Sequence, residues 1–147
     1  MPVDRRGHHR RCSCGAYLTM ATDEARVLTV RQPWAWAIIH GGKDVENRSW
    51  PTKHRGPLLI HAGSAFEPDG YQTVKQLATQ QPPPARELVH GAIIGVVELV
   101  DCLQDFDSEW AVIDQWHWCL RNPQPFDQAV PCPGKLGLWR PPPGLSW

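Results

Sequence analysis

One short stretch of the sequence, residues 43–48, holds four charged residues, of which Lys43, Glu46 and Arg48 are the candidates for a functional site. If this stretch is extended, Glu46 and Arg48 point to the same face, because side chains alternate along a strand. They then form either a salt bridge that presents the guanidinium flat to a phosphate or base edge, or a surface pair worth at most about 1 kcal/mol. Lys43 follows Gly41 and Gly42, where its ammonium reaches a phosphate, acts as a base if its pKa is lowered, or only neutralises a helix C-terminus.

Residues just before this stretch extend the candidate site. Arg31 and Gln32 are expected where a first strand meets a helix, so both point into the same cleft as hydrogen-bond donors, or Gln32 caps the helix. Trp36 shares a side of the helix with His40 and offers an unpaired base a stacking surface worth roughly 1 to 3 kcal/mol. Packing of Trp36 against a loop is the alternative, because the chain holds eight tryptophans. Trp34 falls on the apolar side of the predicted helix, so it is expected in the core.

Basic residues gather around this stretch, although the formal net charge of the whole chain is zero. Residues 26–56 hold six Lys or Arg against two Asp or Glu, a local charge of +4. Lys53, His54 and Arg55 form a basic turn that suits backbone phosphates or is simply solvated, and Lys135 is expected to join it. An anion-binding site is therefore expected in this region.

Glu98 is charged and lies inside the strongest apolar run of the sequence, which also holds Asp101 near its end. It should pair with Arg48 or Arg31, or carry a raised pKa, and either outcome places it near a functional cleft. A buried structural ion pair is the alternative. If the protein is an enzyme, Lys43, Glu46 and Glu98 are its candidate catalytic residues.

The apolar patterns predict an α+β fold built mostly of short strands. Strands are predicted at residues 27–30, 43–50, 57–61, 92–102, 116–121, 126–130 and 136–140. Helices are predicted at residues 34–40, where Pro33 suits the first position and two glycines end the helix, and at residues 67–80. Residues 105–114 are predicted to form an acidic loop with a helical turn. The expected product is a small, mostly antiparallel β-barrel with one to three flanking helices.

Length and composition favour one globular domain of 147 residues with many turns, since the chain holds 15 prolines and 12 glycines. Residues 1–23 are expected to be a basic N-terminal extension, and residues 24–147 the domain. No apolar stretch approaches the roughly 20 residues of a membrane span, and five cysteines in no paired pattern favour reduced thiols. We expect a cytoplasmic protein without a membrane partner. Cys12 and Cys14 are too closely spaced for a typical zinc site, so no metal is expected.

Four segments of the chain, at residues 27–50, 54–62, 95–102 and 134–139, together resemble the ASCH domain, named for the activating signal cointegrator. They span most of residues 26–140. The resemblance implies a PUA-like barrel with a helix after the first strand. It also implies a link to nucleic-acid binding, and a few small bacterial members are amidohydrolases of acetylated cytidine or ribonucleases. In the cytidine-deacetylating members, a lysine similar to Lys43 is followed three residues later by a threonine nucleophile, where this chain has Glu46.

Three functions follow from these observations. The first is a nucleic-acid-binding module, for RNA or single strands ahead of duplex DNA, with a basic cleft that recognises backbone and one or two bases. The second is a small hydrolase that uses Lys43 with Glu46 or Glu98 on a modified nucleoside or RNA. The third is a protein-interaction domain of a regulatory complex. None of the three requires a cofactor, and the oligomeric state is left open.

Overall fold

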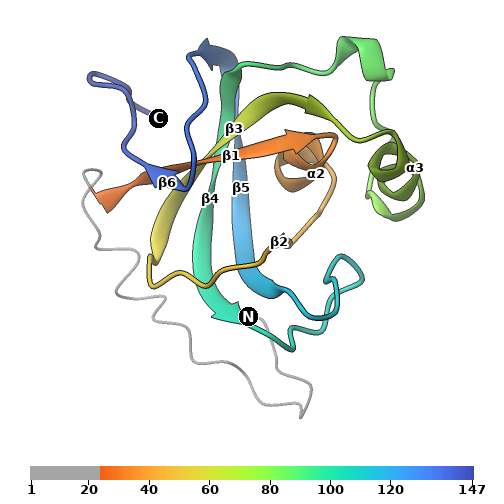
Figure 1. Cartoon of the computed structure of the whole chain (residues 1–147). Helices are drawn as coiled ribbons and strands as arrows, with labels where there is room; N and C mark the ends of the chain where they lie inside the picture. Colours follow the sequence, from red (N-terminus) through yellow and green to blue (C-terminus); the bar gives the residue numbers. More distant parts are fainter. Residues whose placement is uncertain (1–23) are drawn as a thin grey trace.

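The computed structural model describes residues 24–147, which form six strands, two α-helices and one 3-10 turn (Figure 1). In chain order these are β1 (Arg26–Gln32), α2 (Trp34–His40), β2 (Val45–Arg48), β3 (Gly56–Phe66), α3 (Pro68–Leu77), η2 (Ala85–Glu87), β4 (Ala92–Leu103), β5 (Trp116–Pro131) and β6 (Leu138–Trp139). The predicted N-terminal extension, with Cys12 and Cys14, lies outside the described residues.

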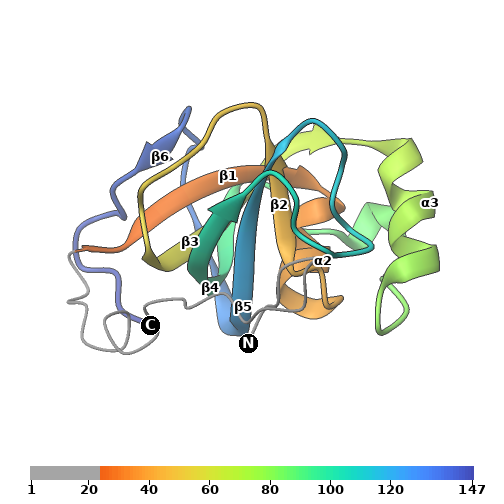
Figure 2. The same cartoon turned by 90° about the horizontal axis from the view of Figure 1, so that it is seen from below.

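All six strands belong to one sheet, in the order β2-β5-β4-β3-β1-β6. Four of its five pairings are antiparallel, and β1 with β3 is the parallel one. Figures 1 and 2 show that the sheet is strongly curved, with β1 lying across the line of β4 and β5. The predicted α+β fold, mostly antiparallel, is therefore confirmed.

Helix α2 occupies the predicted residues and packs against β1, β3, β4 and β5. Its small and branched residues face the core: Ala35, Ala37, Ile38 and Ile39 are all buried. This apolar face follows from helical spacing, because residues three and four apart share one side. The helix ends at Gly41, whose N–H donates to the carbonyl of Ala37. The chain then enters β2, which carries the charged stretch.

Two predicted strands at residues 116–121 and 126–130 are one continuous strand in the structure, β5. Pro123 and Pro125 lie between the two predicted ranges, and proline cannot donate to a strand ladder. Pairing of β5 with β4 instead tolerates them through register shifts, one of them between Val96 and Glu98. Asn122, at the bend, adopts a positive φ of 54°.

Other predicted elements differ in extent. Helix α3 is shorter than predicted because Ala78 is extended and Thr79 donates its N–H to the carbonyl of Gly41. The charged strand is only four residues long. The predicted helical turn in residues 105–114 is wrong, since that loop has turns but no helix. Polar contacts hold this loop in an irregular conformation instead.

Candidate functional site

A cleft of about 810 Å³ opens beside β1 and β2, with walls from the end of β3, from α3 and from two loops. Four basic and three acidic side chains line it, a net charge of +1. The basic ones are Arg31, Lys43, Arg48 and Lys135, and the acidic ones are Glu46, Glu67 and Glu109. The volume lies within the range of about 300 to 1,000 Å³ usual for ligand pockets.

The buried side of the cleft is a cluster in which Glu46 stands between two cations. Glu46 Oε1 lies 3.3 Å from Lys43 Nζ, and its Oε2 lies 2.9 Å from Arg48 Nη2 and accepts from Arg48 Nε at 3.0 Å. The side chains of Lys43 and Glu46 are only 3% and 9% exposed. The structure thus brings the three candidate residues Lys43, Glu46 and Arg48 together.

Burial lowers the pKa of Lys43, because desolvation disfavours the ammonium, while the charge and hydrogen bond of Glu46 act in the opposite direction. The amine also donates to the carbonyl oxygen of Val45 and lies 5.6 Å from the centre of the Trp34 ring. Lys43 is therefore not a solvent-exposed lysine that only neutralises the C-terminus of a helix. It is a desolvated amine at the wall of a cleft.

Arg48 makes three contacts with the protein through its guanidinium. Nε and Nη2 contact Glu46, and Nη2 also donates to the carbonyl oxygen of Thr29 on β1, at 2.8 Å. Nη1 makes no hydrogen bond or ion pair with residues 24–147. Because the side chain is 24% exposed, one edge of the guanidinium is left to meet a ligand in the cleft.

Trp34, expected in the core, packs against it only in part and also lines the cleft. Its Nε1 donates to Glu67 Oε2 at 3.1 Å, and its ring lies against Gly70 of α3, where a Cβ would come within 2.6 Å of the indole. Helical spacing places Trp34 on the apolar side of the helix, so the sequence did not predict that it lines the cleft. The available signal was its position at the first residue of the helix, where no preceding turn covers it.

The loop that follows β4 forms one wall of the cleft and is held by polar side chains. Asn47 Nδ2 donates to the carbonyl of Trp110 at 3.0 Å, and its Oδ1 accepts the N–H of Val112 at 2.9 Å. His117, only 2% exposed, accepts the N–H of Phe106 at Nδ1 and contacts the carbonyl of Val112 through Nε2 at 2.7 Å. His117 is therefore the Nε2–H tautomer.

Gln32 does not reach the cleft. It is 1% exposed, its Nε2 donates to the carbonyl of Val89 at 2.8 Å, and its Oε1 accepts the N–H of Trp36 in the first turn of α2 at 3.0 Å. The expectation that it points into the cleft is wrong, and the alternative of a helix cap holds. Trp36 also lies outside the cleft, with its ring 5.8 Å from that of His40.

Glu98 does not pair with Arg48 or Arg31 as predicted. Its Oε2 lies 3.5 Å from Arg121 Nε, and its Oε1 accepts from Asn122 Nδ2 at 3.1 Å. The reason is register, because Glu98 of β4 stands opposite Arg121 of β5. Glu98 does not line the cleft.

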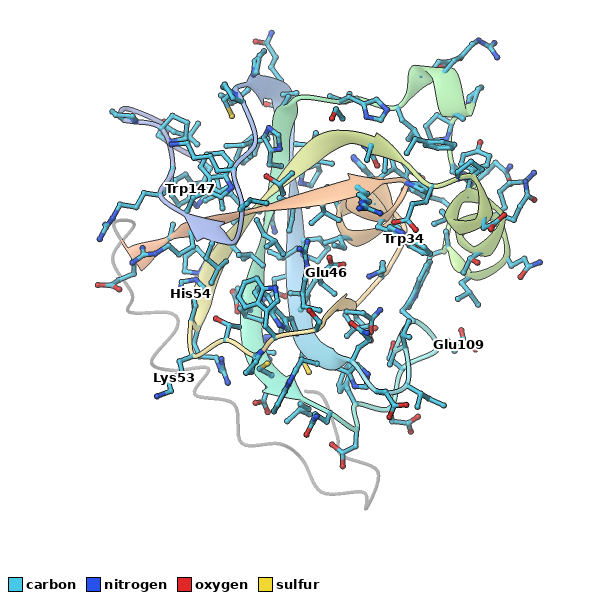
Figure 3. The ribbon with its side chains drawn as sticks, in the orientation of Figure 1. Trp34, Glu46, Lys53, His54, Glu109 and Trp147 are labelled. Carbon is cyan, nitrogen blue, oxygen red and sulfur yellow. The ribbon has the colours of Figure 1, made fainter. Side chains whose placement is uncertain are left out.

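The predicted basic turn is separate from the cleft. Arg55 Nη1 donates to the carbonyls of Thr52 and His54, and Nη2 lies 3.7 Å from Asp101. His54 Nε2 contacts the carbonyl of Pro57 at 2.9 Å, and burial lowers its pKa. Figure 3 shows His54 and the exposed Lys53 toward one edge of the molecule, apart from Trp34 and Glu109 on the other side.

Within residues 24–147, no group of three or more His, Cys, Asp or Glu side chains is placed to hold a metal ion. In the same part of the chain, no helix has the length and apolar character needed to cross a membrane.

Comparison with known proteins places these features in a family. Residues 28–131 match the model of the ASCH domain. Activating signal cointegrator 1 from Homo sapiens is 32% identical over an alignment of 126 residues, and the match covers 77% of this chain and 22% of that protein. The Mus musculus protein of the same name is 30% identical with the same coverage. The chain therefore spans only about a fifth of the length of these relatives.

Proposed function

Because the chain belongs to the ASCH domain family, we propose that it is a nucleic-acid-binding module whose cleft engages RNA or another single strand. The observation that carries this proposal is the arrangement of cations in the cleft. Lys43 and Arg48 lie at its buried side, and the exposed Arg31 and Lys135 lie at its rim. Cations at two depths suit a phosphate chain that passes the rim while part of a nucleotide enters.

The shape of the cleft favours a single strand over a duplex. Glu46 and the Lys43 amine are almost fully buried, so the base pairs of an intact double helix cannot reach them. An unstacked nucleotide can bend into the hollow and present its base edge there. The net charge of +1 also supports a few phosphate contacts rather than a long electrostatic track.

The test uses the two rim cations, because replacing them leaves the buried cluster intact. Fluorescence anisotropy with labelled RNA, single-stranded DNA and duplex DNA of about eight nucleotides measures affinity. We expect the Arg31→Ala and Lys135→Ala double variant to bind RNA at least about tenfold more weakly than the wild type. The matched control is the Arg86→Ala and Lys75→Ala double variant, whose exposed cations lie outside the cleft. Equal affinity of the two double variants would contradict the proposal.

A hydrolase is the second candidate, and the buried amine of Lys43 favours it. An amine with a lowered pKa beside a carboxylate can accept a proton from the water that adds to the acetyl carbonyl of an N-acetylated nucleoside. It can return that proton to the nucleoside nitrogen when the C–N bond breaks and acetate leaves. Glu98 is not part of this candidate site because it lies outside the cleft. Mass spectrometry of N-acetylated nucleosides and of RNA after incubation tests the idea. It requires product with the wild type and none with Lys43→Met, and absence of product at every pH contradicts it.

Protein interaction is the third candidate, supported by exposed aliphatic residues on the loop after β4. Val112 and Ile113 are 52% and 80% exposed, and the relatives are named as cointegrators. Pull-down from cell extract, with and without nuclease, separates protein partners from nucleic-acid partners. Loss of every captured protein on nuclease treatment would count against a direct protein interaction.

We also propose a cytoplasmic location, supported by two cysteines that remain thiols. Cys102 and Cys132 form no disulfide, as expected in a reducing compartment. Fractionation of cells that contain the tagged protein tests this, and recovery in an oxidising compartment would contradict it.

A further inference from the structure

We propose that the cleft holds one unstacked nucleobase against the indole of Trp34, which makes Trp34 the residue that distinguishes a base from bare backbone. This inference rests on the proposed nucleic-acid function and names the part of the ligand that enters the cleft. It differs from the stacking role expected for Trp36, which lies outside the cleft.

The first support is that Trp34 is fixed before a ligand arrives. Its Nε1 donates a hydrogen bond of 3.1 Å to Glu67 Oε2. Its benzo edge lies against the backbone of Gly70, where even a methyl group would clash. A ring held on two edges loses little conformational freedom when a base stacks on it. The glycine in α3 is thus part of the platform, because only glycine lets the helix approach the ring so closely.

The second support is that the other two tryptophans that line the cleft, Trp50 and Trp110, are held by contacts with the core or with the cleft wall. Trp50 packs edge-on against Trp118, with ring centres 4.8 Å apart, and its carbonyl accepts the Trp118 Nε1–H. Trp110 is only 9% exposed, and its backbone is held by Asn47. Trp34 stands beside the charged cluster instead, with Lys43 Nζ 5.6 Å from its ring centre.

The third support is the placement of charge around the ring. Arg31, 67% exposed, lies 3.8 Å from the same Glu67 carboxylate that holds Trp34, so a cation stands at the entrance next to the platform. A phosphate bound at this entrance leaves its own base within reach of the ring. Figure 3 shows Glu46 near the middle of the molecule, Trp34 to the right of it, and Glu109 below Trp34. Because every base has a π-face, such a platform selects for the presence of a base and not for its identity.

The experiment compares an oligonucleotide of about eight nucleotides with an abasic strand of the same length and charge. We expect the wild type to prefer the normal strand, and Trp34→Ala to lose about 5- to 150-fold in affinity for it, with little change for the abasic strand. Trp34→Phe, which keeps an aromatic face, should retain most of the preference. Trp36→Ala is the matched control, since it removes a tryptophan from the same helix but outside the cleft, and it should bind as the wild type does.

A second measurement decides the question even if Trp34→Ala fails to fold. The fluorescence of 2-aminopurine in a single strand should fall when the wild-type protein stacks it, and fall less with Trp34→Phe. An increase on binding would overturn the inference. Salt-sensitive binding with no preference for the normal strand would overturn it while the proposed function stands. Absence of binding to every strand would instead remove the proposed function itself.

Discussion

Arg48 on β2 donates a hydrogen bond of 2.8 Å to the backbone carbonyl of Thr29 on β1. These strands are not neighbours, because β5, β4 and β3 lie between them in the sheet. The bond therefore joins one end of the curved sheet to a strand near its other end. Arg48 also lines the cleft, so one side chain both holds the sheet closed and presents charge to a ligand.

Replacing Arg48 should lower stability as well as binding. Arg48→Gln removes the charged hydrogen bonds to Glu46 and to Thr29, and bonds of this kind contribute about 1.5 to 3 kcal/mol each at most. We expect the free energy of unfolding in urea to fall by about 2 kcal/mol. Arg86→Gln, a change of the same charge at an 82% exposed site, should leave it unchanged. Equal midpoints for the two variants would show that the contact with Thr29 does not hold the sheet.

Lys43 should make stability rise with pH in the alkaline range. Its pKa is lowered below 10.5 by burial, so in the folded protein the amine loses its proton at a lower pH than in the unfolded chain. Between the two pKa values the unfolded chain binds more protons, and the free energy of unfolding therefore rises with pH. This contribution is fully present above 10.5 and is lost as pH falls through the folded-state pKa.

The measurement is urea unfolding of the wild type and Lys43→Met from about pH 8 to 10.5. The stability of the wild type relative to Lys43→Met should increase across this range. The control is Lys75→Met, which removes an exposed lysine from α3 and should keep a constant difference from the wild type. A difference between wild type and Lys43→Met that stays flat with pH would mean that the folded protein does not disfavour the ammonium.

The wall of the cleft should loosen when Asn47 is replaced. Asn47→Ala removes the bonds to the Trp110 carbonyl and the Val112 N–H, so the amide of Val112 is left to solvent. We expect faster hydrogen exchange in residues 109–113 and a loss of about 1 to 3 kcal/mol in the free energy of unfolding. Gln72→Ala, at an exposed position of α3, is the control. Ser108 Oγ also accepts the N–H of Trp110, at 3.1 Å. Unchanged exchange would mean that His117 and Ser108 hold the loop without Asn47.

The salt dependence of binding should identify which cations meet phosphates. For a single strand, each phosphate contact contributes about 0.7 to the slope of log affinity against log salt. Loss of Arg31 and Lys135 together should therefore reduce the slope by about 1.4. Lys53→Ala tests the basic turn, none of whose three basic residues lines the cleft, and it should leave the slope unchanged. A reduced slope for Lys53→Ala would extend the binding surface to that turn.

The sequence by itself determined the features that depend on local geometry. Helix α2 occupies the predicted residues because its apolar spacing and its two terminal glycines are local signals. Glu46 and Arg48 contact each other because residues two apart on a strand share a face. Even so, their burial with Lys43 was not visible in the sequence, since it depends on what covers them.

Only the tertiary structure decided which distant groups meet. Glu98 contacts Arg121 because of the register of β4 against β5, which apolar alternation does not fix for one residue. Arg48 reaches Thr29, 19 residues away in the chain, because the sheet curves back on itself. Trp34 lines the cleft because α3 approaches it at Gly70. These contacts join segments that are far apart in the chain, and no periodic pattern in the sequence relates such segments. The charged residues of the site were therefore predictable, whereas the walls of the cleft and its aromatic platform were not.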